Sequence, residues 1–250
     1  MTRKEAFKDL LKNIGTQSQP QEHKYVGTGN PFADILIIGK EAAIEDGTPQ
    51  SENEITSNFA FWNEVNLDNL NLELLPSDLS YSPLYPYKGQ VFNIDNGSNR
   101  GTSRTWYNYQ KFFNKVFDLK DNKNINFHEA VFITETNSTP SKKTRDAVKD
   151  SICFRKQNIL SSKFIKNFPV IILAGVGYYE INDAKNEIEE IFDVKFQEKR
   201  LAGGKEKQPY WIHWNHDKTR LLINTYQLSM GISDDLLAEI AEEVKKSNLI

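Results

Sequence analysis

Cysteine is almost absent from this chain, and long apolar runs are missing too. The 250 residues contain one cysteine, Cys153, which excludes an internal disulfide and a zinc site built from several cysteines. A single cysteine also suits a reducing compartment. No stretch approaches the roughly 20 consecutive apolar residues that a membrane-spanning helix needs, and residues 1–10 lack the apolar core of a signal peptide. We therefore expect a cytoplasmic protein that does not span a membrane.

The chain also lacks a net positive charge. Its 31 Lys and Arg residues against 34 Asp and Glu residues give a formal net charge of −3, so composition offers no global case for nucleic-acid binding. The charges are nevertheless unevenly distributed. Residues 41–78 contain nine acidic and no basic side chains, whereas residues 141–168 contain eight basic and two acidic ones. A mildly acidic protein with a local basic face fits this pattern.

Apolar periodicity predicts strands that alternate with helices. Short aliphatic or aromatic runs predict strands at residues 33–38, 130–134, 169–174, 211–214 and 220–225. Helical spacing predicts helices at 3–14, 58–65, 104–117, 146–167, 178–191 and 233–246, with Ser103 and Ser233 as N-caps. Such alternation is typical of a mostly parallel sheet between helices. We predict a three-layer α/β/α sandwich with a central mostly parallel sheet, in one domain over 1–250 whose residues 1–30 form an N-terminal helix and loop extension.

Polar side chains directly follow the first and last predicted strands. Gly39-Lys40-Glu41 comes after the run at 33–38, and Gln227-Leu228-Ser229 comes after the run at 220–226. In an open α/β sheet, ligands bind at the carboxyl ends of the strands. We therefore predict that the Glu41 carboxylate and the Gln227 carboxamide meet around a pocket.

The order of these elements and their loop residues resembles the uracil-DNA glycosylase superfamily, over about residues 34–244. That family's first motif reads Gly-Gln-Asp-Pro, Gly-Glu-Ala-Pro or Gly-Ile-Asn-Pro in different branches, and Gly39-Lys40-Glu41-Ala42-Ala43 stands in its place. The middle motif ends in a base-reading Asn, where this chain has Phe132-Ile-Thr-Glu135-Thr-Asn137-Ser-Thr-Pro140. Gln227-Leu228-Ser229 replaces the last motif, His-Pro-Ser, and Met230-Gly231-Ile232 follows in the intercalating-loop position. Ser103-Arg104-Thr-Trp106-Tyr-Asn-Tyr109 resembles a helix start in some bacterial members.

The resemblance implies a divergent glycosylase that hydrolyses the N-glycosidic bond of a damaged or modified base in DNA, without a metal or organic cofactor. Glu41 would orient the attacking water, and Gln227 would stabilise charge on the leaving base. A Gln amide can donate a hydrogen bond, but it cannot take the charged state open to His near neutral pH. The pattern is thus compatible with weakened activity and with none.

Glu135 stands where the family has its base-reading Asn, and Asn137 comes two residues later. An ionised Glu only accepts hydrogen bonds, which suits a base edge with amino hydrogens, such as cytosine or adenine. Asn137 would restore a uracil-type contact if its loop folds inward. The alternative for Asn137 is turn chemistry ahead of Pro140.

The remaining candidates fall into a base-contacting group and a phosphate-contacting group. Lys40, Phe59 and Phe61 would contact the base, the two aromatic rings together with Trp62 as a stacking wall. Core packing is the alternative for the rings, and an ion pair with Lys40 is the alternative for Glu41. The phosphate-contacting candidates are Arg100, Ser103, Arg104, Lys142, Lys143 and Ser229. Further basic residues of the 146–167 helix, Lys149, Arg155 and Lys156, could track a nucleic-acid backbone, or they could simply be solvated surface.

Two other functions stay open besides the glycosylase. The chain could be an inactive nucleic-acid or nucleotide-binding protein that retains the fold, or a small-molecule hydrolase on the same scaffold. His213 and His216 with Asp217 suggest a metal, but the pattern supplies too few ligands. We therefore expect no metal and no cofactor, DNA or a nucleotide-like ligand as the partner, and a monomer.

Overall fold

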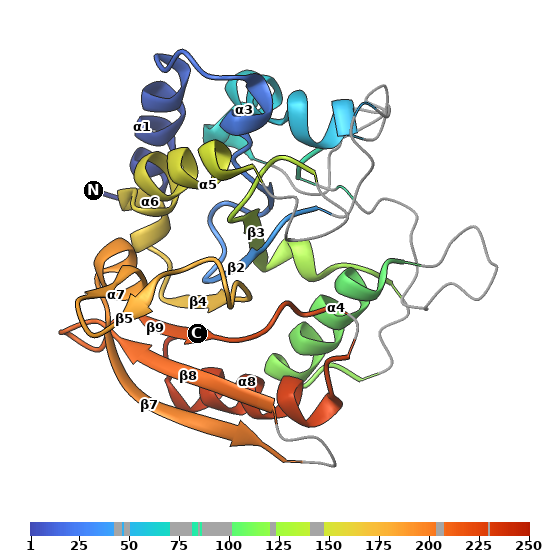
Figure 1. Ribbon diagram of the computed structural model, residues 1–250. Helices are drawn as coiled ribbons and strands as arrows, with labels where there is room; N and C mark the ends of the chain where they lie inside the picture. Colours follow the sequence, from blue (N-terminus) through green and yellow to red (C-terminus); the bar gives the residue numbers. More distant parts are fainter. Residues whose placement is uncertain are drawn as a thin grey trace.

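A mixed sheet forms the centre of the molecule (Figure 1). The computed structural model describes residues 1–42, 47, 51–70, 82–84, 86, 102–120, 124–140, 148–203, 208–229 and 231–250. Within these residues, seven strands form one sheet in the order β1-β3-β2-β4-β9-β8-β7. The strands are β1 (Thr28–Gly29), β2 (Ile35–Gly39), β3 (Val131–Glu135), β4 (Val170–Leu173), β7 (Lys195–Ala202), β8 (Gln208–Trp214) and β9 (Leu221–Asn224).

The four neighbouring strands β3, β2, β4 and β9 are parallel, whereas β1 and β8 run antiparallel to the strands beside them. Ile37 lies in register between Ile133 and Ile172, and Ile172 lies beside Ile223. Strands buried on both faces read as continuous aliphatic runs, which is why the sequence locates them within one or two residues. The predicted mixed α/β fold with a mostly parallel sheet is confirmed.

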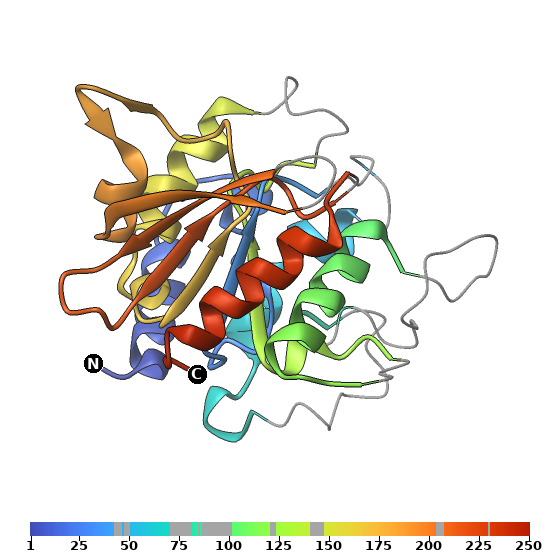
Figure 2. The ribbon, with the colours of Figure 1, turned by 90° about the horizontal axis from the view of Figure 1, so that it is seen from below.

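Helices cover both faces of this sheet (Figure 2). One face carries α1 (Arg3–Gly15), α3 (Asn58–Glu64), α5 (Lys149–Arg155), α6 (Lys163–Lys166) and α7 (Glu187–Phe192). The other carries α4 (Arg104–Val116) and α8 (Asp234–Lys246), green and red in Figure 2. Single 3₁₀ turns lie at Gln21–Lys24, Leu67–Asn69 and Phe127–Glu129, and π-helical turns at Glu52–Thr56 and Lys156–Leu160. Each layer of helices therefore packs on its own hydrophobic cluster.

Strand alternation decides which face each strand-end residue occupies. Ile37 packs in the cluster under α4 and α8, whereas Ile38 packs against the helices of the opposite face. Because successive strand residues point to opposite faces, Gly39 lies on the α4 side. Glu135 is its register partner on β3, so its side chain leaves the sheet on the same side.

The N-caps of the two longest helices on the α4 side are as predicted. The Ser103 hydroxyl accepts a hydrogen bond from the Trp106 N–H at 3.2 Å, and the Ser233 hydroxyl accepts one from the Leu236 N–H at 3.1 Å. Each cap satisfies an N–H group that lacks a partner within its own helix. The starts of α4 and α8 are thus determined locally.

One predicted helix is wrong over its first half, and another is divided into shorter pieces. The stretch at 178–191 begins instead with a hairpin, β5 (Ile181–Asn182) and β6 (Lys185–Asn186), before α7. The Asn182 side chain accepts from the N–H groups of Ala184 and Lys185, both at 2.9 Å, which favours a turn over a helix. The stretch at 146–167 is divided into α5, a π-helical turn and α6, and Ser162 caps the last piece with a bond from the Ile165 N–H.

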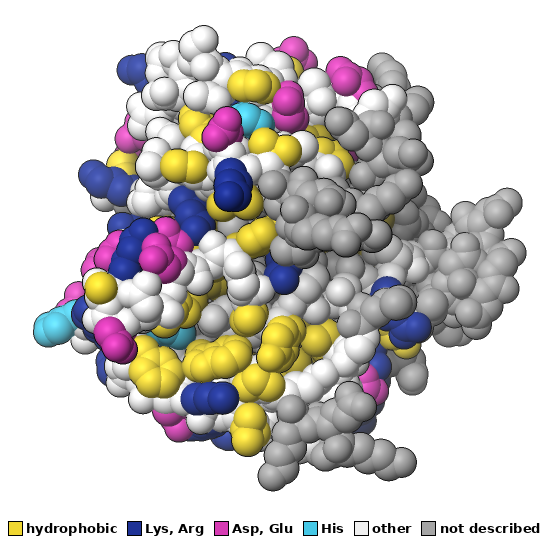
Figure 3. Space-filling view, viewed as in Figure 1, with side chains coloured by type: hydrophobic (Ala, Val, Ile, Leu, Met, Phe, Trp, Pro, Cys, Tyr) yellow, Lys and Arg dark blue, Asp and Glu magenta, His cyan; other side chains and the backbone are white. Residues whose placement is uncertain are grey.

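Strand β7 was not predicted, because its sequence lacks a clear apolar alternation. It forms an exposed edge of the sheet beside β8. Figure 3 shows apolar side chains gathered over β7 and β8, and Phe196 and Leu201 of β7 are 45% and 50% exposed. Charged side chains between them are a common protection of edge strands.

The sequence predicts a protein without a membrane-spanning helix. Among the residues that the structure describes, no helix combines the length and the apolar character needed to cross a membrane. The longest of them, such as α1 and α8, are amphipathic and bury one face against the sheet.

Candidate active site

The loops after β2 and β9 are in direct contact. The Lys40 backbone N–H donates a hydrogen bond to Gln227 Oε1 at 2.9 Å, although the two residues are 187 positions apart. The two loops therefore meet at the carboxyl edge of the sheet, and a pocket between the Glu41 carboxylate and the Gln227 carboxamide stays a prediction. Because Oε1 already accepts this bond, the Nε2 amide is the part of Gln227 that can serve as a donor to a ligand.

The loop at 227–229 is fixed to α4 as well as to β2. Asn108, on the first turns of α4, donates from Nδ2 to the Ser229 carbonyl at 2.8 Å. Leu228 is fully buried in the cluster beneath α4 and α8. Gln227 is thus held between two anchors, which favours one orientation of its side chain.

Glu41 receives a hydrogen bond from a third strand end. The Tyr178 hydroxyl donates to Glu41 Oε2, and Tyr178 follows Gly177 just beyond β4. The Lys40 ammonium lies 5.5 Å from the centre of the same ring, in the geometry of a cation–π contact. Residues after β2, β4 and β9 therefore converge on one rim of the sheet.

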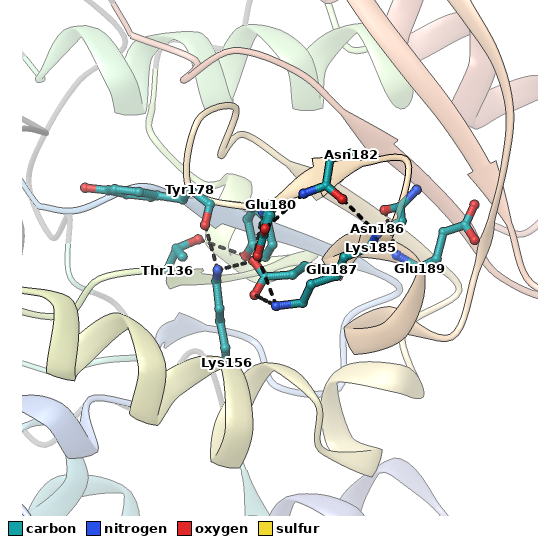
Figure 4. A network of polar contacts seen from close by, with 10 residues as sticks. Thr136, Lys156, Tyr178, Glu180, Asn182, Lys185, Asn186, Glu187 and Glu189 are labelled. Atoms are coloured by element: carbon teal, nitrogen blue, oxygen red, sulfur yellow. Dashed lines mark hydrogen bonds and ion pairs between the residues drawn. The ribbon is translucent and has the colours of Figure 1, made fainter.

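A polar network supports Tyr178 from below (Figure 4). Lys156 Nζ donates to the Tyr178 carbonyl at 2.7 Å and forms an ion pair with Glu187 at 2.5 Å. The Glu180 N–H and Lys185 also donate to the Glu187 carboxylate, at 2.9 Å and 3.1 Å. Partial burial would raise the pKa of Glu187, but these three donors outweigh it and lower the pKa to about 2.

Glu135 has a different environment at the end of β3. A Cβ atom on Gly39 would lie 2.1 Å from Glu135 Oε2, so the carboxyl group occupies the space that only glycine leaves. Part of the residue is accessible, but Oε2 is shielded from solvent and has no hydrogen-bond partner within the described part of the chain. Burial and, next, the nearby charge of Glu41 raise the pKa of Glu135 to about 8, and Arg155 partly opposes them.

Arg155 is buried beside Glu135 but bonds to its backbone. Nε donates to the Glu135 carbonyl at 2.8 Å, and Nη2 donates to Thr134 Oγ1 at 2.7 Å. Nη1 donates to the Tyr25 carbonyl. Burial lowers the pKa of Arg155 to about 10, so the side chain keeps its charge at neutral pH. The idea that Arg155 and Lys156 track a nucleic-acid backbone is wrong, since one is interior and the other is committed to Glu187.

Several further buried polar atoms at this edge lack a partner among the described residues. They are Tyr109 Oη on α4, Asn137 Nδ2, Asn224 Oδ1 and Thr225 Oγ1, all on residues with at most 5% exposure. Asn137 Oδ1 accepts from the Thr139 N–H at 3.2 Å, and the Asn137 N–H donates to the Lys40 carbonyl at 2.7 Å. Asn137 therefore makes the turn contact that was the alternative to reading a base. Its Nδ2 amide has no hydrogen-bond partner among the described residues. Most buried polar groups in proteins have a hydrogen-bond partner, so these atoms are candidates for contact with a ligand.

The aromatic candidates pack away from these atoms. Phe59 is 8% exposed in the cluster beneath α1, where its ring reaches Gly15 and Lys24. Phe61 contacts Trp62 edge to face, with ring centres 6.3 Å apart. The core alternative thus accounts for Phe59, and no contact of either ring places it at the carboxyl edge within the described residues.

The phosphate candidates are only partly described. Ser103 uses its hydroxyl as the cap of α4, and Arg104 follows it as an exposed residue of the first turn. Ser229 lies in the Gln227 loop. Arg100, Lys142 and Lys143 lie outside the described residues.

Sequence reasoning missed Tyr178, placed Arg155 on a solvated basic face instead of in the interior, and gave Tyr109 no role of its own. The rule that ligands bind at carboxyl strand ends could have found Tyr178, which stands just past β4. No local pattern distinguishes Arg155 from the exposed basic residues around it, and Tyr109 reads as an ordinary core position of α4.

The described residues offer acid–base chemistry and no cluster for a metal. No group of three or more His, Cys, Asp or Glu side chains in the described ranges could hold a metal ion. Glu41 can accept a proton, the Gln227 amide can donate a hydrogen bond, and Glu135 can hold a proton near neutral pH. No protein-family model matches the chain, and no curated protein matches it either.

Proposed function

We propose that the protein is a divergent uracil-DNA glycosylase-like hydrolase, with that family's arrangement of a sheet between helices. It binds a nucleobase at the carboxyl edge and breaks the N-glycosidic bond. The observation that carries the proposal is the hydrogen bond from the Lys40 N–H to Gln227 Oε1. This bond brings the Glu41 loop and the Gln227 loop to one place, as the chemistry requires.

Each side chain has a distinct task in this reaction. Glu41, held by the Tyr178 hydroxyl, orients the attacking water and stabilises positive charge on the sugar. Gln227 Nε2 donates to an oxygen of the leaving base as negative charge develops there. Because the Gln amide is neutral, we expect a slower reaction than an imidazole would support; loss of a whole oxyanion donor costs about 10²–10³ in rate.

A second candidate is nucleotide or nucleic-acid binding without turnover. The neutral Gln227 favours it, since its amide offers orientation without an ionisable group. In this case the unpartnered donors at the rim bind the base, and no bond is broken.

Base release from oligonucleotides separates the candidates. Single and double strands that contain uracil, hypoxanthine or xanthine are incubated with the protein, and abasic sites are cleaved with alkali and resolved on a gel. We expect release by the wild type and a loss of about 10²-fold or more in Glu41→Gln. Glu64→Gln, an exposed change at the end of α3, serves as the matched control.

The other outcomes are equally informative. Salt-sensitive binding without any release supports the binding protein and overturns the glycosylase. Neither release nor binding excludes both and leaves a small-molecule hydrolase.

A further inference from the structure

The Glu135 carboxyl group lies in surroundings that do not favour the stability of the fold. Its Oε2 atom lies against Gly39 on the α4 side of the sheet, shielded from solvent and without a donor in the part of the chain that the structure describes. Tyr109 Oη on α4 is also buried without a partner within the described residues, and burial and, next, the nearby Glu135 raise the pKa of this hydroxyl. A carboxyl group that serves only stability would be expected to receive hydrogen bonds, because an unpartnered buried polar group costs free energy.

We propose that the protonated Glu135 carboxyl contacts the bound base and donates its proton to the leaving base, so that Glu135 and Glu41 act as an acid and base pair. The inference rests on the proposed hydrolysis of an N-glycosidic bond. It assigns to Glu135 the proton that the neutral Gln227 cannot supply.

Three features of the site keep Glu135 protonated. Its carboxyl group is desolvated, and the charge of Glu41 opposes a second negative charge nearby. The buried cation Arg155 donates its hydrogen bonds to the Glu135 carbonyl, the Tyr25 carbonyl and Thr134 Oγ1, and not to the Glu135 carboxyl group. Two carboxyl groups whose environments push their pKa values apart are the usual basis of an acid and base assignment.

A protonated Glu135 also changes how the base edge is recognised. An ionised carboxylate only accepts hydrogen bonds, whereas the neutral carboxyl donates one and accepts one. It can therefore pair with a base edge that offers an acceptor beside a donor, as an Asn side chain would. The sequence-based preference for amino-bearing edges, which assumed an ionised Glu135, no longer follows.

The step balances with water as the only co-reactant. Glu41 takes a proton from water as the water oxygen bonds to the sugar C1′. The bond from C1′ to the base nitrogen breaks, its electron pair passes to the base, and the Glu135 proton passes to the base as well. The products are a sugar hydroxyl and a neutral base, and Glu41 and Glu135 then regain their original states by proton exchange through solvent.

Single-turnover base release across pH 5–10 tests the assignment. For the wild type we expect the rate to fall as the pH rises through about 8, because Glu135 loses its proton there. In Glu135→Gln we expect a rate about 10²-fold lower than the wild-type rate at pH 7. The fall in rate near pH 8 should be absent from this variant. Substrate binding, measured by fluorescence anisotropy, should be retained, since a Gln amide also donates and accepts. Glu64→Gln should keep the wild-type profile.

Infrared difference spectra provide a readout that does not depend on activity. The wild type at pH 6.5 should show a protonated carboxyl band that is missing in Glu135→Gln and that titrates near pH 8. If that band is absent, or if Glu135→Gln matches the wild-type rate at every pH, the inference is overturned while the proposed function stands. If the wild type releases no base at all, the proposed function fails and the inference falls with it.

Discussion

Glu135, at the end of β3, and Glu187, at the start of α7, are two carboxyl groups with opposite environments. Arg155 and Lys156, neighbours in sequence, approach them differently: Arg155 bonds to the Glu135 backbone, whereas Lys156 bonds to the Glu187 carboxylate itself. Glu187 has three donors and a pKa of about 2. Glu135 Oε2 has no donor among the described residues, and the pKa of Glu135 is about 8. Burial and, next, the charge of Glu41 keep Glu135 protonated, whereas hydrogen-bond donors on the carboxylate keep Glu187 ionised.

This contrast separates a supporting region from a reactive one. The Glu187 network fixes the segment that carries Tyr178 and satisfies its own charges (Figure 4). The rim around Glu135 keeps unsatisfied polar atoms at the carboxyl ends of the strands. Such a division is expected where a rigid scaffold holds groups that a ligand will complete.

The largest effect should come from the pH dependence that Glu135 gives to stability. A carboxyl pKa raised from 4.5 to about 8 means that the folded state holds a proton the unfolded state has lost. The free energy of unfolding should therefore fall as pH rises from 4.5 through 8, by on the order of 5 kcal/mol. Urea denaturation at a series of pH values measures it, and Glu135→Gln should remove this fall while Glu64→Gln keeps it. Parallel curves for the wild type and Glu135→Gln would show that Glu135 is ionised in the fold.

Gly39→Ala tests whether the Glu135 carboxyl group packs directly against Gly39. The backbone at Gly39 is not left-handed, but an added Cβ would lie 2.1 Å from Glu135 Oε2 and 2.9 Å from Cδ. We expect the free energy of unfolding to drop by about 2 kcal/mol, in the range of overpacked cores. In a Glu135→Ala background the same change should cost almost nothing, and a double-mutant cycle measures the coupling. Equal costs in both backgrounds would mean that the carboxyl group does not occupy this space.

The sequence predicts the scaffold of this site better than its chemistry. Buried parallel strands consist of continuous aliphatic runs, so the sequence predicts the strands around Ile37, Ile172 and Ile223. The residues after the carboxyl ends of these strands include Glu41 and Gln227. The Glu187 network depends on partners such as Lys156, 31 residues away, and leaves no periodic trace. The protonation of Glu135 depends on burial and on Glu41, which no residue-by-residue pattern contains.

Glu187→Gln tests the other side of the comparison and should have a smaller effect. A carboxyl pKa lowered from 4.5 to about 2 adds stability that is present above pH 4.5 and lost as pH falls through 2. The group is partly open to solvent, which screens the ion pair, so we expect the wild type to exceed Glu187→Gln by only about 1 kcal/mol at pH 7. The difference should shrink on acidification, whereas the stability that Glu135 contributes is lost as the pH rises. Urea denaturation at pH 7 and pH 3 decides this, and a difference that grows at pH 3 would contradict the assigned donors.

Tyr178→Phe should produce the smallest change in stability and confine its effect to the reaction. The substitution removes the hydroxyl that donates to Glu41 Oε2, but it leaves the ring under Lys40 and the carbonyl that receives Lys156. We expect the free energy of unfolding to change by less than about 1 kcal/mol and base release to slow by about 10-fold, because Glu41 loses the contact that orients it. Tyr210→Phe is the matched control. Tyr210 lies on β8, and its hydroxyl bonds to Glu239 of α8 at 3.2 Å, so this variant should release base at the wild-type rate. If Tyr178→Phe also keeps that rate, Glu41 does not depend on the β4 end, and the supporting region and the reactive region are independent of each other.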